Sequence, residues 1–77
     1  MPNNFGDQYG VQRAFAVHLI ARNFDISSNI ASDVLGYSES LVILGGHDIS
    51  RTEVLLMATS DTVKALTALA LANGRAE

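Results

Sequence analysis

Two histidines are the residues of this chain best suited to acid/base or metal chemistry, and they lie far apart in the sequence. His47 stands beside Asp48 after a pair of glycines, whereas His18 falls in a segment with helical periodicity. A metal site needs three or four converging ligands. We therefore expect no metal site, and we interpret the glycines as a turn with Asp48 helping to cap the next helix.

The serines form no pattern that is typical of a nucleophile. The sequence contains neither a Gly-x-Ser-x-Gly elbow nor a phosphate-binding Gly-x-x-x-x-Gly-Lys loop. Most serines instead stand where helices are expected to begin, and serine is a favoured cap there: Ser27, Ser28, Ser38, Ser40, Ser50 and Ser60. We therefore expect no enzymatic activity, no catalytic residue and no cofactor.

The composition indicates one small and apolar domain over residues 1–77, with a flexible N-terminus at 1–6. A chain of this size buries only about 60–65% of its unfolded surface. Small chains usually compensate with disulfides, a metal or oligomerisation. Because 48% of the residues are hydrophobic and none is cysteine, we expect the chain to self-associate as a homodimer.

The charges argue against a nucleic-acid or membrane partner. The net charge is −3, and the five cations are spread singly as Arg13, Arg22, Arg51, Lys64 and Arg75. Phosphates of nucleic acids and of anionic lipids are held by clustered Lys and Arg. The first ten residues lack the pattern of a secretory signal, and charges interrupt the longest apolar run, Val54–Ala72. We expect a cytoplasmic protein without a membrane segment.

Hydrophobic periodicity predicts a first helix over residues 8–24, with Asp7 as its N-cap. Apolar residues fall on two of its sides, and one of these sides carries Val11, Phe15 and Leu19. One side can face the core of the protein. The other is free to meet a second subunit or the remaining helices.

The middle of the chain predicts two short elements. A helix over 28–35 is expected to begin after a cap at Ser27 or Ser28 and to end at Gly36, followed by a short helix or turn over 39–45. The run "LVIL" at 41–44 fits a strand or a helical turn. We favour a helix because no second strand-like segment is available to pair with it.

This middle segment resembles the helix-turn-helix of bacterial regulators. The resemblance covers residues 30–46 and is carried by small, turn and apolar residues, namely Ala31, Ser32, Leu35, Gly36, Tyr37 and Val42. It implies a DNA-binding regulator that dimerises through its last helix. The second short helix, however, exposes Glu39 and offers no Arg, Lys, Asn or Gln that could reach base edges.

A long C-terminal helix over 51–73 is the clearest local prediction. Ser50 and Glu53 are spaced as a capping box, and Gly74 is expected in the left-handed position that closes the helix. Ser60 and Asp61 allow a break. A broad stripe is expected to be buried, comprising Leu55, Leu56, Ala58, Val63, Leu66, Leu69 and Ala70. Met57, Ala68 and Leu71 form a second apolar strip on the polar side, as interfaces often do.

These observations predict an all-α fold, a small bundle of three to four helices with a long C-terminal helix. The expected function is that of a non-catalytic protein-protein interaction module that acts as an adaptor, regulator or inhibitor through apolar helix faces. The alternative is the DNA-binding regulator. The residues expected to bind a partner protein are Phe15, Leu19, Tyr37, Met57, Lys64, Ala68 and Leu71.

Overall fold

The protein is all-helical over the residues that its computed structural model describes, which are 4–46 and 48–75, with side chains for 8–46 and 48–74. Three helices follow one another: α1 (Asn4–Phe24), α2 (Ser28–Leu44) and α3 (Arg51–Arg75). The predicted all-α fold with a long C-terminal helix is thereby confirmed. The run 41–44 lies within α2, so the helical interpretation of that run is also confirmed.

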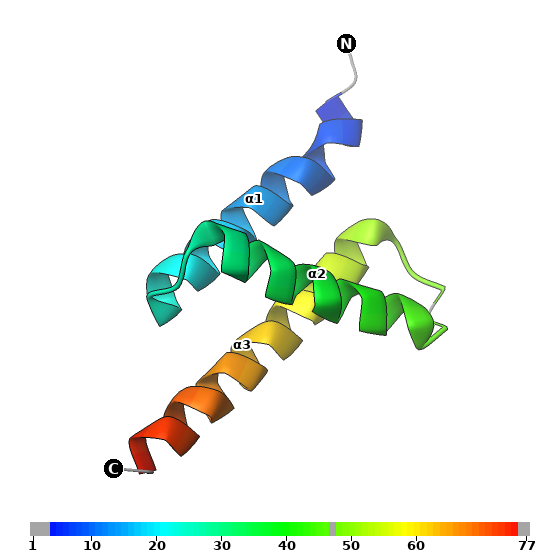
Figure 1. The fold of residues 1–77 in the computed structure, drawn as a ribbon. Helices are drawn as coiled ribbons and strands as arrows, with labels where there is room; N and C mark the ends of the chain where they lie inside the picture. The colour runs from blue at the N-terminus through cyan, green and yellow to red at the C-terminus, as the bar shows by residue number, and fades with distance from the viewer. Residues whose placement is uncertain (1–3, 47, 76–77) are drawn as a thin grey trace.

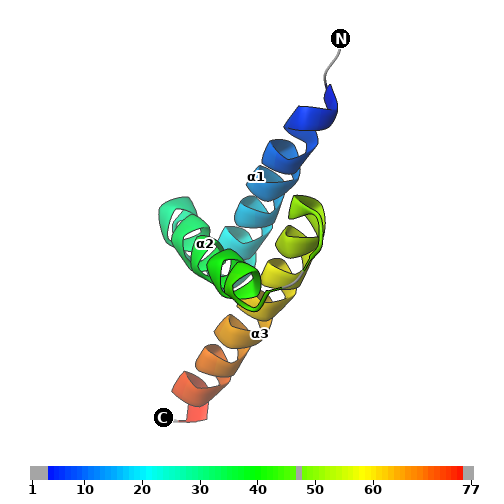
Figure 2. The same ribbon diagram turned by 90° about the vertical axis from the view of Figure 1, so that its right-hand side faces the viewer.

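The three helices form two layers (Figures 1 and 2). The helices α1 and α3 run in the same general direction with an offset along their length, and α2 crosses over both of them on one side. The molecule measures 53 × 27 × 14 Å along its principal axes. Because α3 continues past the end of α1, its C-terminal part projects from the packed region.

The core lies where α2 crosses the other two helices. Ala31 and Leu35 of α2 and Ala58 of α3 are completely buried, and Ile20 of α1 is nearly so. Small residues at two of these four positions allow the helix backbones to approach each other closely. Within residues 8–46 and 48–74, nine apolar residues are buried in this core: Ala16, Val17, Ile20, Ala31, Leu35, Val42, Val54, Leu55 and Ala58.

Side-chain caps begin two of the helices as the sequence predicts. Ser27 accepts a hydrogen bond from the backbone N–H of Ile30 at 3.1 Å. At the start of α3, Ser50 Oγ accepts from the N–H of Glu53 at 3.2 Å, and the Glu53 carboxylate accepts from the N–H of Ser50 at 3.2 Å. Each bond satisfies a backbone donor that has no partner inside its helix. The capping box and the Ser27 cap are confirmed.

The predicted division of the middle segment is wrong, because α2 is one uninterrupted helix from Ser28 to Leu44. Gly36 lies within α2 and does not end it. A Cβ at Gly36 would lie 3.3 Å from Nη2 of Arg13, so the glycine allows the arginine of α1 to approach the backbone of α2. This tertiary contact outweighs a helix propensity that is about 1 kcal/mol poorer than that of alanine. The helix ends instead before Gly46, which has a φ of 81°.

Other predicted helix ends differ from the observed ones. The first helix already begins at Asn4, so Asp7 lies inside it and is not its N-cap, and residues 4–6 of the predicted flexible N-terminus are helical. The long helix passes Ser60 and Asp61 without a break. It also continues through Gly74 to Arg75, so Gly74 does not close it. Single residues that often occur at helix ends therefore do not determine the ends of α1 and α3 in this chain.

Candidate interaction surfaces

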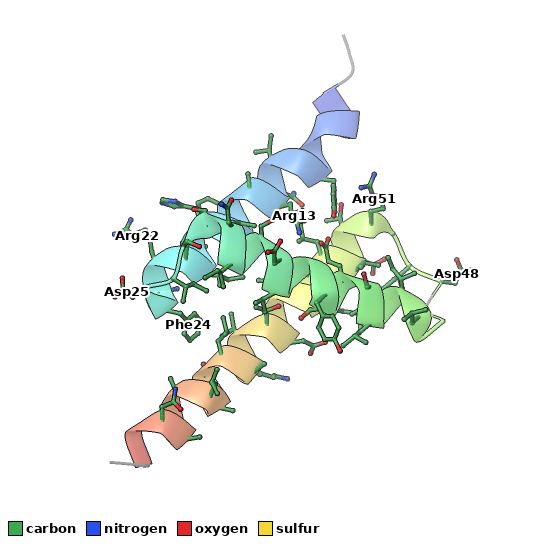
Figure 3. The ribbon with its side chains drawn as sticks, viewed as in Figure 1. Arg13, Arg22, Phe24, Asp25, Asp48 and Arg51 are labelled. Atoms are coloured by element: carbon green, nitrogen blue, oxygen red, sulfur yellow. The ribbon has the colours of Figure 1, made fainter. Side chains whose placement is uncertain are left out.

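A polar cluster joins α1 to α2 beside the core. Arg13 Nε donates to the Glu39 carboxylate at 2.9 Å, Nη1 donates to Ser32 Oγ at 3.0 Å, and Nη2 donates to the backbone carbonyl of Ser32 at 3.0 Å. The predicted exposure of Glu39 is wrong, because only 8% of this residue is accessible. Figure 3 shows Arg13 in the angle between the two helices. These groups satisfy one another, so the cluster has a structural explanation.

Tyr9 of α1 extends this polar cluster to Arg51, the first residue of α3. Its hydroxyl donates to the Glu39 carboxylate at 2.5 Å, and the Arg51 guanidinium lies 4.0 Å from the centre of its ring. Burial raises the pKa of Tyr9, and the negative charge of Glu39 raises it further, against a smaller opposing effect of Arg51 and Arg13. The tyrosine therefore links all three helices in its neutral form.

An apolar groove runs between α1 and α3, with a volume of about 590 Å³. We call it the α1–α3 groove. Its lining is apolar or uncharged throughout: Val11, Gln12, Phe15, Ala16, Leu19, Ile20 and Asn23 of α1, with Thr52, Leu55, Leu56, Thr59 and Val63 of α3. Buried core residues form its floor, whereas Phe15 and Leu56 on its walls are 62% and 65% exposed.

The α1–α3 groove lies on a side of α1 and α3 that α2 does not cover. Thr62 of α3 faces α2, since its hydroxyl donates to Ser38 Oγ at 2.9 Å. At 3.6 residues per turn, Leu56, Thr59 and Val63 project from a different side of α3 than Thr62 does. Arg13 likewise faces α2 from α1, whereas Phe15 projects away from it. The groove is therefore a second apolar face, separate from the core contacts of α2.

The projecting part of α3 is a further exposed apolar surface. Leu69 and Leu71 are more than half exposed, and residues 67–74 are all classed as exposed. By length and composition Arg51–Gly74 could cross a membrane, a criterion that core helices of soluble proteins also meet, and 22% of its most apolar stretch is buried in the molecule. The expectation that the chain has no membrane segment stays a prediction.

The seven residues predicted to bind a partner are all exposed, but the structure does not gather them into one surface. Phe15 and Leu19 both line the α1–α3 groove. Tyr37 lies on α2, and the remaining four are spread along α3 from Met57 to Leu71. The groove lining includes none of these other five.

Sequence reasoning missed the contribution of α3 to the groove. Leu56 and Val63 were expected in the buried stripe, as were Leu69 and Ala70, but all four are exposed. A helix that packs against neighbours on one side only cannot bury so wide a stripe. The width of the stripe indicates that α3 has more than one apolar face, but it does not indicate which residues belong to each face.

No cluster of potential metal ligands occurs within residues 4–46 and 48–75. His18 is exposed on α1, and His47 lies outside the described residues. The helix-turn-helix resemblance loses its geometric basis, because residues 30–44 belong to one helix with no turn at Gly36. Comparison with known proteins finds no matching family model, no similar curated protein and no similar solved structure.

Proposed function

We propose that this chain is a non-catalytic protein-protein interaction module. It self-associates as a homodimer in the cytoplasm, and it acts as an adaptor, regulator or inhibitor by covering an apolar surface of another protein. Recognition between apolar helix faces is a common mode for domains of this kind.

The area of exposed surface is the observation that carries this proposal. A compact monomer of 8.2 kDa is expected to expose about 4,500 Å². This chain exposes 5523 Å², which is about 1,000 Å² more. Among the residues whose side chains the structure describes, thirteen large hydrophobic ones contribute to the exposed surface, so covering it with protein would be favourable.

The shape of the molecule supports the same conclusion. Its radius of gyration is 13.9 Å, whereas a compact chain of 77 residues is expected to have about 11.5 Å. The difference reflects the offset of α1 and α3 and the projecting end of α3 (Figure 2). An extended surface of this kind gives a partner more area to contact than a compact bundle of equal mass.

Sedimentation equilibrium of the purified chain at micromolar concentration tests the self-association. We expect a mass of twice 8.2 kDa, with dissociation on dilution. A mass that stays at 8.2 kDa up to high micromolar concentration would contradict the proposal. Salt provides a control, because association through apolar surface should not weaken at high ionic strength.

A further inference from the structure

We propose that the α1–α3 groove is the homodimer interface and that its occupant is the same groove of a second copy. The two copies would pack α1 and α3 of one chain against α1 and α3 of the other, with α2 on the two outer sides. This inference rests on the proposed self-association and specifies the surface that performs it.

The extent of the groove on its two helices suits such a pairing. Its lining spans residues 11–23 on α1 and 52–63 on α3, which correspond to about 18 Å and about 17 Å of helix. The groove face therefore presents two apolar helix segments of nearly equal length. Two such faces packed together bring two helices of one chain against two of the other, an arrangement in which apolar side chains of facing helices interdigitate.

The groove face contributes exposed apolar surface that a second copy would cover. A stable complex of standard size buries about 800 Å² on each partner. The chain exposes 5523 Å², about 1,000 Å² above the expectation for its mass. Only part of this excess lies on the groove face, where five large apolar side chains are 39–67% exposed: Val11, Phe15, Leu19, Leu56 and Val63.

The shape of the groove and its uncharged lining favour a second copy as its occupant. Phe15 and Leu56 stand out from the walls, while Ala16 and two threonines leave the space between them open. One chain can therefore insert its large side chains into the hollow of the other. No lining residue carries a charge, so two copies meet there without repulsion between lining side chains.

Symmetry explains why association through this face would stop at two chains. When the same surface of both subunits forms the contact, each surface is used once and no further copy can add. A contact between the groove and a different surface would leave both a free groove and a free complementary surface on every assembly, and it would continue into larger oligomers.

Paired charge variants test the interface. Phe15→Glu places a carboxylate on the exposed wall of the groove, and we expect it to weaken dimerisation by about 30-fold or more. Ile43→Glu is the matched control, because Ile43 is 62% exposed on α2 but does not line the groove. We expect its dimerisation constant to change less than about threefold.

Mixing experiments distinguish a lost contact from a lost fold. Phe15→Glu chains are mixed with Phe15→Lys chains, and in a second sample with Leu56→Lys chains, and the masses are measured by sedimentation. We expect dimers to reappear in at least one mixture, because opposite charges then meet across the interface. Circular dichroism of each variant alone should show the helix content of the unaltered chain.

Two results would overturn this inference while the proposed function stands. The first is a dimer that Leu71→Glu disrupts and Phe15→Glu does not, since the projecting end of α3 would then be the interface. The second is a dimer that neither Phe15→Glu nor Leu71→Glu weakens, since its interface would then lie on another surface of the chain. A monomeric unaltered chain would instead contradict the proposed self-association itself.

Discussion

The ion pair between Arg13 and Glu39 is expected to stabilise the folded chain, and replacing Glu39 tests this. Replacing Glu39 by alanine leaves the guanidinium and the Tyr9 hydroxyl without their shared acceptor. Breaking a buried pair costs about 3–5 kcal/mol, but the side chains of Arg13 and Glu39 are 24% and 11% exposed, so water lowers this cost. We expect Glu39→Ala to reduce the free energy of unfolding by about 2 kcal/mol in urea denaturation.

Asp33 provides a control for that measurement. It is an exposed acid on the same helix, so Asp33→Ala should change the free energy of unfolding by less than about 0.5 kcal/mol. The double variant Arg13→Met with Glu39→Met should recover part of the loss, since apolar replacement of both partners removes the unpaired charge. Equal effects of Glu39→Ala and Asp33→Ala would show that the pair contributes nothing.

Ionisation of Tyr9 is expected to lower the stability of the folded chain at alkaline pH. Its pKa is raised above the ordinary value of 10.0 by burial and by Glu39. The stabilisation by neutral Tyr9 is therefore fully present below pH 10 and is lost as the pH rises through the raised value. Urea midpoints measured from pH 8 upward should fall steeply only above about pH 10.

The variant Tyr9→Phe identifies the source of this pH dependence. It lacks the titrating hydroxyl, so its urea midpoint should fall less steeply at alkaline pH than that of the unaltered chain. Tyr37→Phe is the matched control, because it removes an exposed tyrosine hydroxyl on α2 and should keep the original profile. A profile that Tyr9→Phe does not change would contradict the role of Tyr9.

Within and at the ends of the helices, replacing two glycines by alanine is expected to change the stability in opposite directions. Gly10 lies inside α1 with nothing within 4 Å of an added Cβ, so Gly10→Ala should stabilise the protein by about 0.5–1 kcal/mol. Gly46 also has open space, but its φ of 81° strains any other residue. We expect Gly46→Ala to destabilise by about 1 kcal/mol. Thermal unfolding of both variants measures the difference, and a shift in the same direction for both would contradict the assigned helix ends.

Local signals predicted those parts of the fold that local contacts determine. Ser27, Ser50 and Glu53 act within three residues of their partners, so their caps can be read from spacing alone. Gly36 could not be interpreted in this way. Its place inside α2 depends on Arg13, which lies 23 positions earlier in the chain and reaches the helix only in the folded state.

The groove was predictable on one helix but not on the other. The side of α1 that carries Val11, Phe15 and Leu19 was recognised as a second apolar face, because two apolar sides on one helix imply two contacts. The sequence predicts that Leu56 and Val63 belong to the buried stripe, because it does not tell which part of a wide stripe the neighbouring helices cover. The crossing position of α2 decides that division.

In the whole molecule, one side of the layer formed by α1 and α3 is not covered by another helix. The helix α2 covers one side of α1 and α3, and the groove with its exposed apolar walls lies on another. The three helices of a single chain therefore leave part of its apolar residues exposed on the groove side. In the proposed homodimer, a second copy would supply helices that cover this side without any change in the fold of the first.

The mass of the Leu56→Glu variant beside the unaltered chain tests this account most directly. Leu56 is 65% exposed in the single chain and lines the groove, so the substitution should leave the helices intact. We expect sedimentation equilibrium at the same micromolar concentration to give twice 8.2 kDa for the unaltered chain and 8.2 kDa for folded Leu56→Glu. Equal masses for the two chains, with both folded, would contradict the account.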